Sequence, residues 1–380
     1  MRKVCVVITA RPSYSRVKSL LSALNESPLI KLDLIVMASA LVDRYGTAVN
    51  YIEKDGFNIT EKLYTLFEGS DIKTAPKTTA IGILELSTSF DRIKPDIVVT
   101  IADRYETIAT AIAASYMNIT LVHIQGGEVT GNIDEKVRHA VTKLADYHMA
   151  SSVDARERII KMGEIPQNVF LTGCPSIDIA ANIDGLDFKP QEKYGGVGSN
   201  IDISNGYFVV MQHPVTTELE DSNFQIIETI KAIENLKIPT FWFWPNVDSG
   251  SDMISKSLRN YREKGKLEHV HFFKNMEPRD FLKLLKSSLC IIGNSSVGIR
   301  ECSYLGVFAI NIGTRQKNRL RGSNVIDVDH DSVLIESAVK SIINRTKPEP
   351  SKIYGDGFAG KRIAEIIEKV ELISHKTIEY

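Results

Sequence analysis

The sequence predicts two α/β domains in series, each a doubly wound parallel sheet. Its strand-like runs are continuously apolar rather than alternating, which is typical of strands buried on both faces. A helical pattern follows most of these runs, as in βαβ units. At 380 residues the chain also exceeds one ordinary hydrophobic core. A polar stretch rich in Gly and Asn, residues 182–206, separates the two series and is interpreted as a linker.

The first series begins at the N-terminus. Strands are expected in "KVCVVIT", "LDLIVMA", "PDIVVTI" and "ITLVHI", with helices at 15–26, after the second strand, at 106–116 and from Ile133. The apolar start, Val4–Thr9, is interpreted as a buried strand and not a signal peptide, because it ends at Arg11-Pro12 without a cleavage site. No apolar run approaches the ~18 residues that span a bilayer, so no membrane segment is expected.

The second series follows the linker. Strands are expected in "YFVVMQH", "PTFWFWP", "VHFF", "LCIIGNSS" and "VFAINIG", with helices at 224–235, 253–264, 278–286 and 297–305. A last amphipathic helix, Gly360–Lys376, has no strand after it and must cover one of the domains. We therefore expect domains at residues 1–183 and 200–358, then a C-terminal helix within 359–380, and the interdomain cleft as the site.

Composition narrows the class of protein. Lys and Arg together number 46 and Asp and Glu 47, a balance that offers no reason to expect nucleic acid or an anionic membrane surface. The hydrophobic content of 43% is typical of a globular chain. The four cysteines are scattered without metal-ligand spacing, so we expect a reduced, cytoplasmic protein that binds no metal.

The segment "GDGFAG", residues 355–360, matches a dinucleotide fingerprint only literally. Such a fingerprint needs a strand before it and a complete βαβ unit after it, and the chain ends soon afterwards. A turn at the start of the last helix is the better interpretation.

Polar residues follow nearly every expected strand, at the edge where open α/β sheets bind ligands. These residues are Arg11, Ser13 and Ser15 after the first strand, Asp103, Arg104 and Glu106 after the third, Gln125 and Glu128 after the fourth, and His213, Asn246, Asn294, Ser295, Ser296 and Arg315 in the second domain.

The segment "GNSSVGIRE" places two hydroxyls and free backbone N–H groups at a helix start, which favours a phosphate. An ordinary Ser N-cap is the structural alternative. Cationic side chains at the equivalent strand ends favour a diphosphate, and Glu301 on the same helix is suited to accept hydrogen bonds from ribose hydroxyls.

The acidic residues have structural alternatives as well. Asp103 can cap a helix or pair with Arg104, and Asp134 can favour a helix dipole or pair with Arg138 four residues later. Asn132 and Glu135 form a possible capping pair. The helix is expected to turn one apolar stripe to the core, made of Ile133, Val137, Ala140, Val141 and Leu144.

Taken together, the motifs resemble the UDP-N-acetylglucosamine 2-epimerases, specifically the hydrolysing branch that opens sialic and related nonulosonic acid pathways. The motifs are "ITARPSYSR", "ADRYET", "HIQGGEVTGNIDEKVRHAVTKLADYH", "TGCPSID", "MQHPVT", "GNSSVGIRE" and "YGDGFAGKRI". The resemblance implies a GT-B arrangement, two Rossmann-like domains with UDP in the cleft. It also implies that the C-terminal helix crosses back to the first domain and that the protein forms homodimers or homotetramers.

The resemblance also implies roles for the residues at the strand ends. Acid/base work falls to Asp103 and Asp134. The UDP-sugar ligands are expected to be Arg11, Ser15, Arg104, His213, Asn246, Ser295, Ser296, Glu301 and Arg315, with His213 and Arg315 at the diphosphate, the two serines on phosphate and Glu301 on the ribose. Where the family often has a catalytic Glu, this chain has Gln125, which cannot exchange a proton at neutral pH. Either Glu128 takes that role or Gln125 orients the substrate.

The implied reaction releases UDP from C1 while a carboxylate removes the C2 proton, and water then adds to the glycal to give N-acetylmannosamine. The two glycines after Gln125 are expected to let the sugar ring approach closely. The route requires no metal and no nicotinamide cofactor. Alternatives are a hydrolase for UDP-2,4-diacetamido-2,4,6-trideoxyglucose (the legionaminic acid precursor), a non-hydrolysing 2-epimerase, a GT-B glycosyltransferase and a non-catalytic UDP-sugar sensor.

Overall fold

The computed structural model describes residues 1–43, 47–68, 73–130, 133–215, 217–245, 250–373 and 375–379. The chain divides into two compact units. Residues 1–128, 133–178 and 354–380 make up the first, and residues 179–353 together with Val129 and Thr130 belong to the second. Each unit is described by itself below, and the domain limits inferred from the sequence stay a prediction.

The first unit is built on a seven-stranded parallel sheet in the order β3-β2-β1-β4-β5-β6-β7. Its strands are β1 (Arg2–Ile8), β2 (Ile30–Met37), β3 (Glu61–Leu63), β4 (Ile97–Ile101), β5 (Thr120–Ile124), β6 (Tyr147–Ala150) and β7 (Val169–Leu171). The order reverses between β1 and β4, which is the point where doubly wound folds bind ligands.

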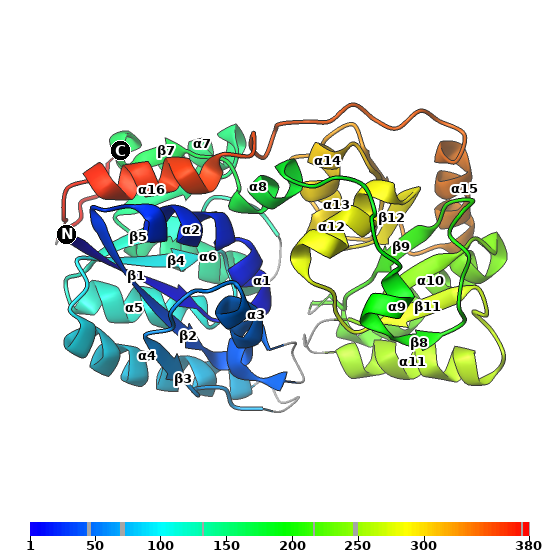
Figure 1. Cartoon of the computed structure of the whole chain (residues 1–380), viewed down its shortest axis with the longest axis horizontal. Coiled ribbons are helices and arrows are strands. Elements are labelled where there is room, and N and C mark those ends of the chain that lie inside the picture. Colours follow the sequence, from blue (N-terminus) through cyan, green and yellow to red (C-terminus); the bar gives the residue numbers. More distant parts are fainter. Residues whose placement is uncertain are drawn as a thin grey trace. The chain divides into compact units, whose positions relative to one another are not determined.

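Helices cover both faces of the first sheet, as the continuous apolar strands predict (Figure 1). They are α1 (Arg11–Ser15), α2 (Lys18–Glu26), α3 (Ala48–Lys54), α4 (Thr74–Ile93), α5 (Thr107–Tyr116), α6 (Ile133–Leu144), α7 (Val153–Lys161) and α16 (Ala359–Lys369), with short 3-10 turns at Ala38–Leu41 and Pro166–Asn168. The helix α8 (Pro175–Ala181) spans the limit between the two units. The last helix, α16, packs against α2 over one face, and α4, α5 and α6 cover the other.

The second unit repeats this plan in the order β14-β13-β12-β9-β10-β11-β8. Its strands are β8 (Val197–Gly198), β9 (Phe208–Met211), β10 (Thr240–Phe243), β11 (Val270–Phe273), β12 (Cys290–Gly293), β13 (Phe308–Ile312) and β14 (Val325–Val328). Its helices are α9 (Pro190–Tyr194), α10 (Ser222–Leu236), α11 (Ser251–Glu263), α12 (Pro278–Ser287), α13 (Ser296–Ile299), α14 (Glu301–Leu305) and α15 (Ser332–Ile342), with a 3-10 turn at Leu219–Asp221. The order reverses between β9 and β12. Two Rossmann-like sheets were predicted, and this is confirmed.

Three expected elements differ from the structure. The stretch 182–206 is not only a linker, because β8 within it adds an antiparallel edge strand to β11. The helix expected at 297–305 breaks at Arg300, where the chain passes from α13 to α14. The C-terminal helix ends at Lys369 and not at 376, because the chain beyond it bonds to the first sheet: Ile373 exchanges two hydrogen bonds with Thr120, and Glu371 O accepts one from Tyr147.

The buried face of α6 also differs from the expected stripe. Val137 and Val141 are buried, but the Ile133 side chain is 51% exposed, and Arg138 is almost fully buried. The helix turns this face inward because the Arg138 guanidinium makes hydrogen bonds inside the unit, described below.

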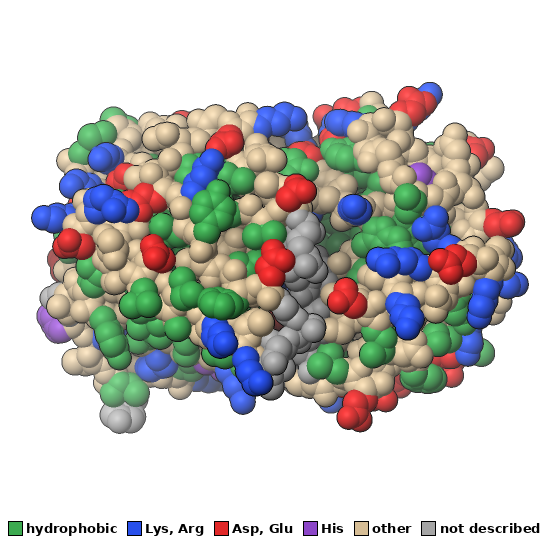
Figure 2. All heavy atoms as spheres, turned by 90° about the horizontal axis from the view of Figure 1, so that it is seen from below, with side chains coloured by type: hydrophobic (Ala, Val, Ile, Leu, Met, Phe, Trp, Pro, Cys, Tyr) green, Lys and Arg blue, Asp and Glu red, His purple; other side chains and the backbone are tan. Residues whose placement is uncertain are grey.

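The surface is mixed in charge. On the face shown in Figure 2, the described basic and acidic side chains are interspersed rather than gathered by sign. Among the described residues, none of the helices has both the length and the apolar character needed to cross a bilayer.

Candidate active site

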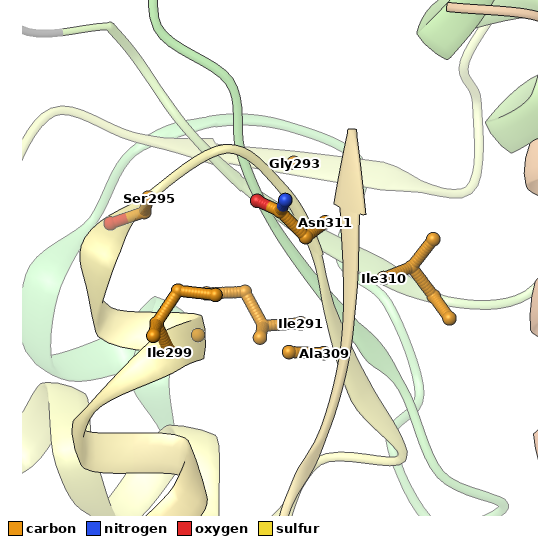
Figure 3. A pocket seen from close by; sticks show the side chains of 8 residues that line it. Ile291, Gly293, Ser295, Ile299, Ala309, Ile310 and Asn311 are labelled. Atoms are coloured by element: carbon orange, nitrogen blue, oxygen red, sulfur yellow. The ribbon is translucent and has the colours of Figure 1, made fainter. Parts of the chain in front are cut away.

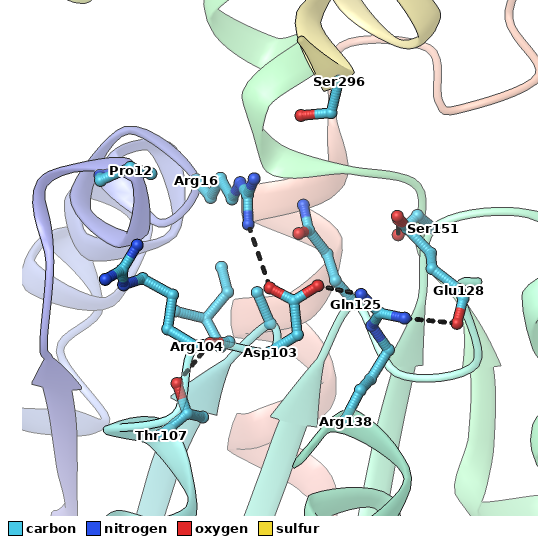
Figure 4. A network of polar contacts seen from close by, with 12 residues as sticks. Pro12, Arg16, Asp103, Arg104, Thr107, Gln125, Glu128, Arg138, Ser151 and Ser296 are labelled. Carbon is cyan, nitrogen blue, oxygen red and sulfur yellow. Dashed lines mark hydrogen bonds and ion pairs between the residues drawn. The ribbon is translucent and has the colours of Figure 1, made fainter. Parts of the chain in front are cut away.

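In the first unit, a buried cation holds Asp103, the second residue after β4. One nitrogen of the Arg138 guanidinium donates to the Asp103 carboxylate, and the other donates to Glu128 O at 2.6 Å (Figure 4). On the other side of the carboxylate, the Arg16 guanidinium lies 4.0 Å away. Opposite charges at this distance favour the ionised form of a carboxylate. Arg138 therefore links the Asp103 carboxylate to the backbone of Glu128, another predicted acid/base residue.

Glu128 has a different environment. Its side chain is buried and its Oε1 accepts a hydrogen bond of 2.9 Å from the Ser151 hydroxyl (Figure 4). Ser151 follows β6, so residues after three neighbouring strands, β4, β5 and β6, contribute to one cluster. Two carboxyl groups in unlike surroundings, one beside guanidinium groups and one beside a hydroxyl, suit a division into base and acid.

Gln125 follows β5 in a backbone conformation that is unusual for its type. Its φ of 64° is left-handed, and its Nε2 donates to Cys174 Sγ at 2.8 Å. The same sulfur lies 2.9 Å from Ser176 Oγ. A left-handed non-Gly residue costs on the order of 1–3 kcal/mol and persists only where the surroundings impose it. Gln125 is 1% exposed, so these contacts orient its amide firmly.

A second set of buried hydrogen bonds, made by His123 and Thr142, reaches the turn that carries Asp103. His123 Nε2 lies 3.0 Å from the carbonyl oxygen of Ala102, and Thr142 Oγ1 lies 3.2 Å from His123 Nδ1. A carbonyl only accepts, so Nε2 carries the proton and the Thr142 hydroxyl donates to Nδ1. Burial lowers the pKa of His123 to about 3, which keeps the ring neutral. Ala102 itself is left-handed, with φ 63°.

The two glycines after Gln125 serve the protein's own packing. A Cβ at Gly126 would lie 2.9 Å from Thr142 Oγ1, and one at Gly127 would lie 2.2 Å from Ala155 O. Protein atoms fill the space where a Cβ would project, and the expectation that these glycines let a sugar ring approach stays a prediction.

The remaining predicted residues of the first unit have varied contacts. Ser15 Oγ donates to Pro12 O at 3.0 Å, inside its own helix turn. Arg104 Nε reaches Glu106 Oε2 at 3.3 Å, so this guanidinium pairs with the next carboxylate along the chain. Arg11 begins α1 and Asp134 lies in the first turn of α6, both half-buried.

In the second unit, the predicted cations meet at the switch point of the sheet. His213 follows β9 and is joined through its backbone to the Asn294 side chain, which follows β12. Arg315 lies after β13, and its guanidinium donates to Asn294 O at 3.2 Å. Gln316, which the sequence analysis did not single out, donates to the same oxygen at 2.9 Å. The predicted residue Asn246 lies outside the described residues.

The two serines at the start of α13, Ser295 and Ser296, make different hydrogen bonds. Ser295 Oγ accepts from Val297 N at 3.4 Å and so caps α13, which is the structural alternative considered for it. Ser296 Oγ accepts from the buried Arg300 at 3.1 Å. Glu301 is 6% exposed, and its Oε2 lacks a hydrogen-bond donor among the described residues, although Arg300 Nε is 4.0 Å away. This arrangement leaves a carboxylate oxygen available to a ligand hydroxyl.

A small pocket lies beneath the Ser pair, between α13 and the ends of β12 and β13 (Figure 3). Its lining is largely apolar, with Ile291, Ile299 and Ala309 opposite the Ser295 and Asn311 side chains. The described residues contain no group of three or more His, Cys, Asp or Glu side chains that could hold a metal ion.

Comparison with known proteins assigns the chain to a family. A family model described as UDP-N-acetylglucosamine 2-epimerase matches residues 22–368. The chain belongs to this family. The hydrolysing UDP-N,N'-diacetylbacillosamine 2-epimerase of Legionella pneumophila is 30% identical to this epimerase family member, over 98% of the chain and 97% of the relative. The polysialic acid biosynthesis protein P7 of Escherichia coli is 35% identical over 86% of the chain and 83% of the relative.

Solved structures agree on the fold of this family member. The UDP-GlcNAc 2-epimerase of Neisseria meningitidis bound to UDP-GlcNAc matches with a TM-score of 0.80 and 17% identity, over 96% of this chain and 99% of that one. The Methanocaldococcus jannaschii enzyme in complex with UDP-GlcNAc and UDP matches with a TM-score of 0.76, also at 17% identity, over 96% and 99% of the two chains. At these identities the likeness shows the GT-B type of fold.

Several residues of the site were missed from the sequence. Arg138 was considered only as a partner of Asp134, and the signal that it is buried was its place between Val137 and Val141 on one helix face. Arg16 and Arg300 lie within the motifs "ITARPSYSR" and "GNSSVGIRE" but were passed over, because an Arg is usually solvated. Ser151 lies outside the quoted motifs and gave no signal.

Proposed function

We propose that the protein is a hydrolysing 2-epimerase that converts UDP-N-acetylglucosamine and water to N-acetylmannosamine and UDP. The observation that carries the proposal is the Asp103 carboxylate held by Arg138 and Arg16 after β4, where the same Arg138 guanidinium also binds the backbone oxygen of Glu128. Family membership supports the substrate class, a UDP-2-acetamido sugar. The names of the relatives in Legionella pneumophila and Campylobacter jejuni, at 30% and 31% identity, support the hydrolysing branch.

In the proposed reaction the C1–O bond to UDP breaks and the C2 proton leaves, which gives a 2-acetamidoglucal. Asp103 is the base, because the neighbouring guanidinium groups favour its carboxylate form. His213 and Arg315, which meet at Asn294, stabilise the diphosphate as it leaves. Water then adds at C1 and a proton returns to C2 on the opposite face.

The second step needs another acid/base group. Gln125 cannot supply it, since an amide does not exchange a proton at neutral pH. We assign this step to Glu128, whose carboxyl group is buried and hydrogen-bonded by Ser151, with Asp134 as the further acidic residue and Gln125 as an orienting amide. Glu301 is assigned to the ribose because its Oε2 has no donor among the described residues. Arg11, Ser15, Arg104 and the two serines complete the proposed UDP-sugar ligands.

A second substrate has specific support. The relative at 30% identity is named as a 2-epimerase of UDP-N,N'-diacetylbacillosamine, and the one at 31% as a 2-epimerase of GDP/UDP-N,N'-diacetylbacillosamine; the sugar is a 2,4-diacetamido-2,4,6-trideoxy sugar. The proposed chemistry at C1 and C2 is the same for both sugars, so the choice between them depends on side chains around C4 and C6.

Product analysis with each UDP-sugar tests the proposal. The purified protein is incubated with either sugar without added metal, and the products are separated and identified by NMR. We expect UDP together with a free 2-epimerised sugar from at least one of the two. An intact UDP-sugar epimerised at C2 would assign the protein to the non-hydrolysing branch. Binding of UDP without turnover of either sugar would support a sensor instead and refute the proposal.

A further inference from the structure

Asn294 occupies the centre of the polar cluster in the second unit. It is fully buried, at 0% exposure, and follows β12 at the switch point of the sheet. Its Oδ1 accepts from the backbone N–H of His213 at 2.8 Å, and its Nδ2 donates to the backbone oxygen of His213 at 2.8 Å. The side chain therefore satisfies both backbone groups of one residue on the neighbouring strand end.

Chemistry alone decides the orientation of this amide. The reverse orientation would set the Asn294 NH2 against an N–H group and its oxygen against a carbonyl. The backbone of Asn294 is fixed as well, because its N–H donates to Met211 O at 3.1 Å. Gly293 before it has φ 131°, and a Cβ there would lie 2.1 Å from Met211 O, so only glycine fits this position beside β9. Asn294, the hub of this polar cluster, is therefore held through both its side chain and its backbone.

The backbone oxygen of Asn294 accepts hydrogen bonds from two further side chains. Arg315 donates to it at 3.2 Å and Gln316 at 2.9 Å, both from the segment that follows β13. One residue thus ties together the ends of three strands, β9, β12 and β13. The two residues assigned to the diphosphate are both bound to it, His213 through its backbone and Arg315 through its guanidinium.

We infer that Asn294 is a positioning residue, which sets His213 and Arg315 at the spacing that binds the diphosphate of a UDP-sugar. The inference rests on the proposed function, and it concerns a residue that contacts no ligand itself. Partners that orient binding side chains are commonly worth on the order of 10- to 100-fold in affinity.

The test compares UDP and uridine binding to Asn294→Ala and Asn294→Asp with binding to the wild type. Loss of the hub should raise the Kd of UDP by about 10- to 100-fold. Uridine, which has no diphosphate, should bind all three proteins alike. Asn324→Asp is the matched control, because Asn324 is also buried and donates to two backbone oxygens, Gly298 O and Val307 O at 3.0 Å each, yet touches neither His213 nor Arg315.

Asn294→Asp adds a readout in pH. An ionised Asp places an acceptor against His213 O, whereas a protonated Asp can donate to it as the amide does. UDP affinity of this variant should therefore recover toward that of the wild type as the pH falls from 8 to 5, while the deficit of Asn294→Ala should stay constant.

The outcomes separate the inference from the proposed function. A wild-type protein that does not bind UDP would refute both. Wild-type binding with an unchanged UDP Kd in folded Asn294→Ala would overturn the inference alone. Equal weakening of UDP and uridine, or an equal loss in Asn324→Asp, would show a general structural effect and would also overturn it.

Discussion

At the scale of single residues, the acidic candidates were predictable from the sequence and their partners were not. Asp103 and Glu128 stand within four residues of the ends of apolar runs, where position in an open sheet already points to ligand binding. Arg138 stands in the middle of a helix, and only the tertiary structure reveals that its guanidinium contacts both Asp103 and Glu128. A pattern in one helix cannot show which strand end that helix will meet.

The two glycines after Gln125 are under a packing constraint that the sequence does not reveal, because protein atoms lie where a Cβ would project. We expect Gly127→Ala to lower the free energy of unfolding by roughly 2–5 kcal/mol, because a left-handed φ of 73° and a contact of 2.2 Å with Ala155 O both oppose a methyl group. Gly56 has φ 85°, and a Cβ added there would meet nothing within 4 Å, so Gly56→Ala should cost only about 1 kcal/mol. Urea unfolding of both variants measures the difference. Equal costs would mean that the contact is relieved elsewhere.

At the scale of elements, continuously apolar strands were predictable and half-exposed ones were not. The strands β1, β2, β4, β5 and β9 to β13 coincide with the expected runs. The strands β3 and β14 are half-exposed, and each is too brief to show a clear periodicity. The early end of α16 was hidden because the competing hydrogen bonds come from Thr120 and Tyr147, far away in sequence.

The segment after α16 also builds a charged cluster with α6. Lys376 Nζ donates to Thr142 O at 3.2 Å and Lys143 O at 3.0 Å, and it pairs with Glu164 at 2.5 Å. Cations near the last carbonyls of a helix stabilise it through the helix dipole. The C-terminal segment therefore supports the helix that carries Arg138.

This cluster predicts a pH effect on stability. Burial opposes ionisation of Glu164, but hydrogen bonds from His148, Lys143 and Lys376 outweigh it and lower its pKa from 4.5 to about 2. Between these values the unfolded chain binds more protons, so this contribution is complete above pH 4.5 and is lost as the pH falls toward 2. The wild type should lose up to ~1.4 kcal/mol per pH unit there through this group.

Urea unfolding between pH 6 and 3 checks this effect. Glu164→Gln should give a flatter curve of stability against pH than the wild type. Glu157, which is exposed on α7, provides the control, and Glu157→Gln should follow the wild-type curve. A wild-type slope retained in Glu164→Gln would assign the acid sensitivity to other carboxyl groups.

At the scale of the whole molecule, two Rossmann-like units followed from the repeated strand-and-helix pattern. The limits of the units were harder to predict from the sequence, and so was the return of the C-terminal segment to the first unit. Residues 354–380 join the first unit through contacts that no local pattern encodes. The expected interdomain cleft, homo-oligomer and cytoplasmic location stay predictions.

The proposed division of labour between the units predicts where a ligand acts. UDP should slow amide hydrogen exchange in the second unit, around His213, 293–301 and 313–319. At 100 times its Kd, a ligand adds about 2.7 kcal/mol, which corresponds to about 100-fold slower exchange for amides that exchange by unfolding of that unit. Mass spectrometry of peptic fragments measures this. Protection confined to the first unit would contradict the assignment.

The central claim is that a carboxylate of the first unit exchanges the C2 proton of the sugar. The most direct measurement is proton NMR of the reaction in D2O. Wild type and Asp103→Asn are compared at equal saturation with the UDP-sugar substrate. We predict deuterium at C2 of the free sugar released by the wild type, and no product from Asp103→Asn although UDP still binds. Product that keeps its original C2 proton, or normal turnover by Asp103→Asn, would contradict the account.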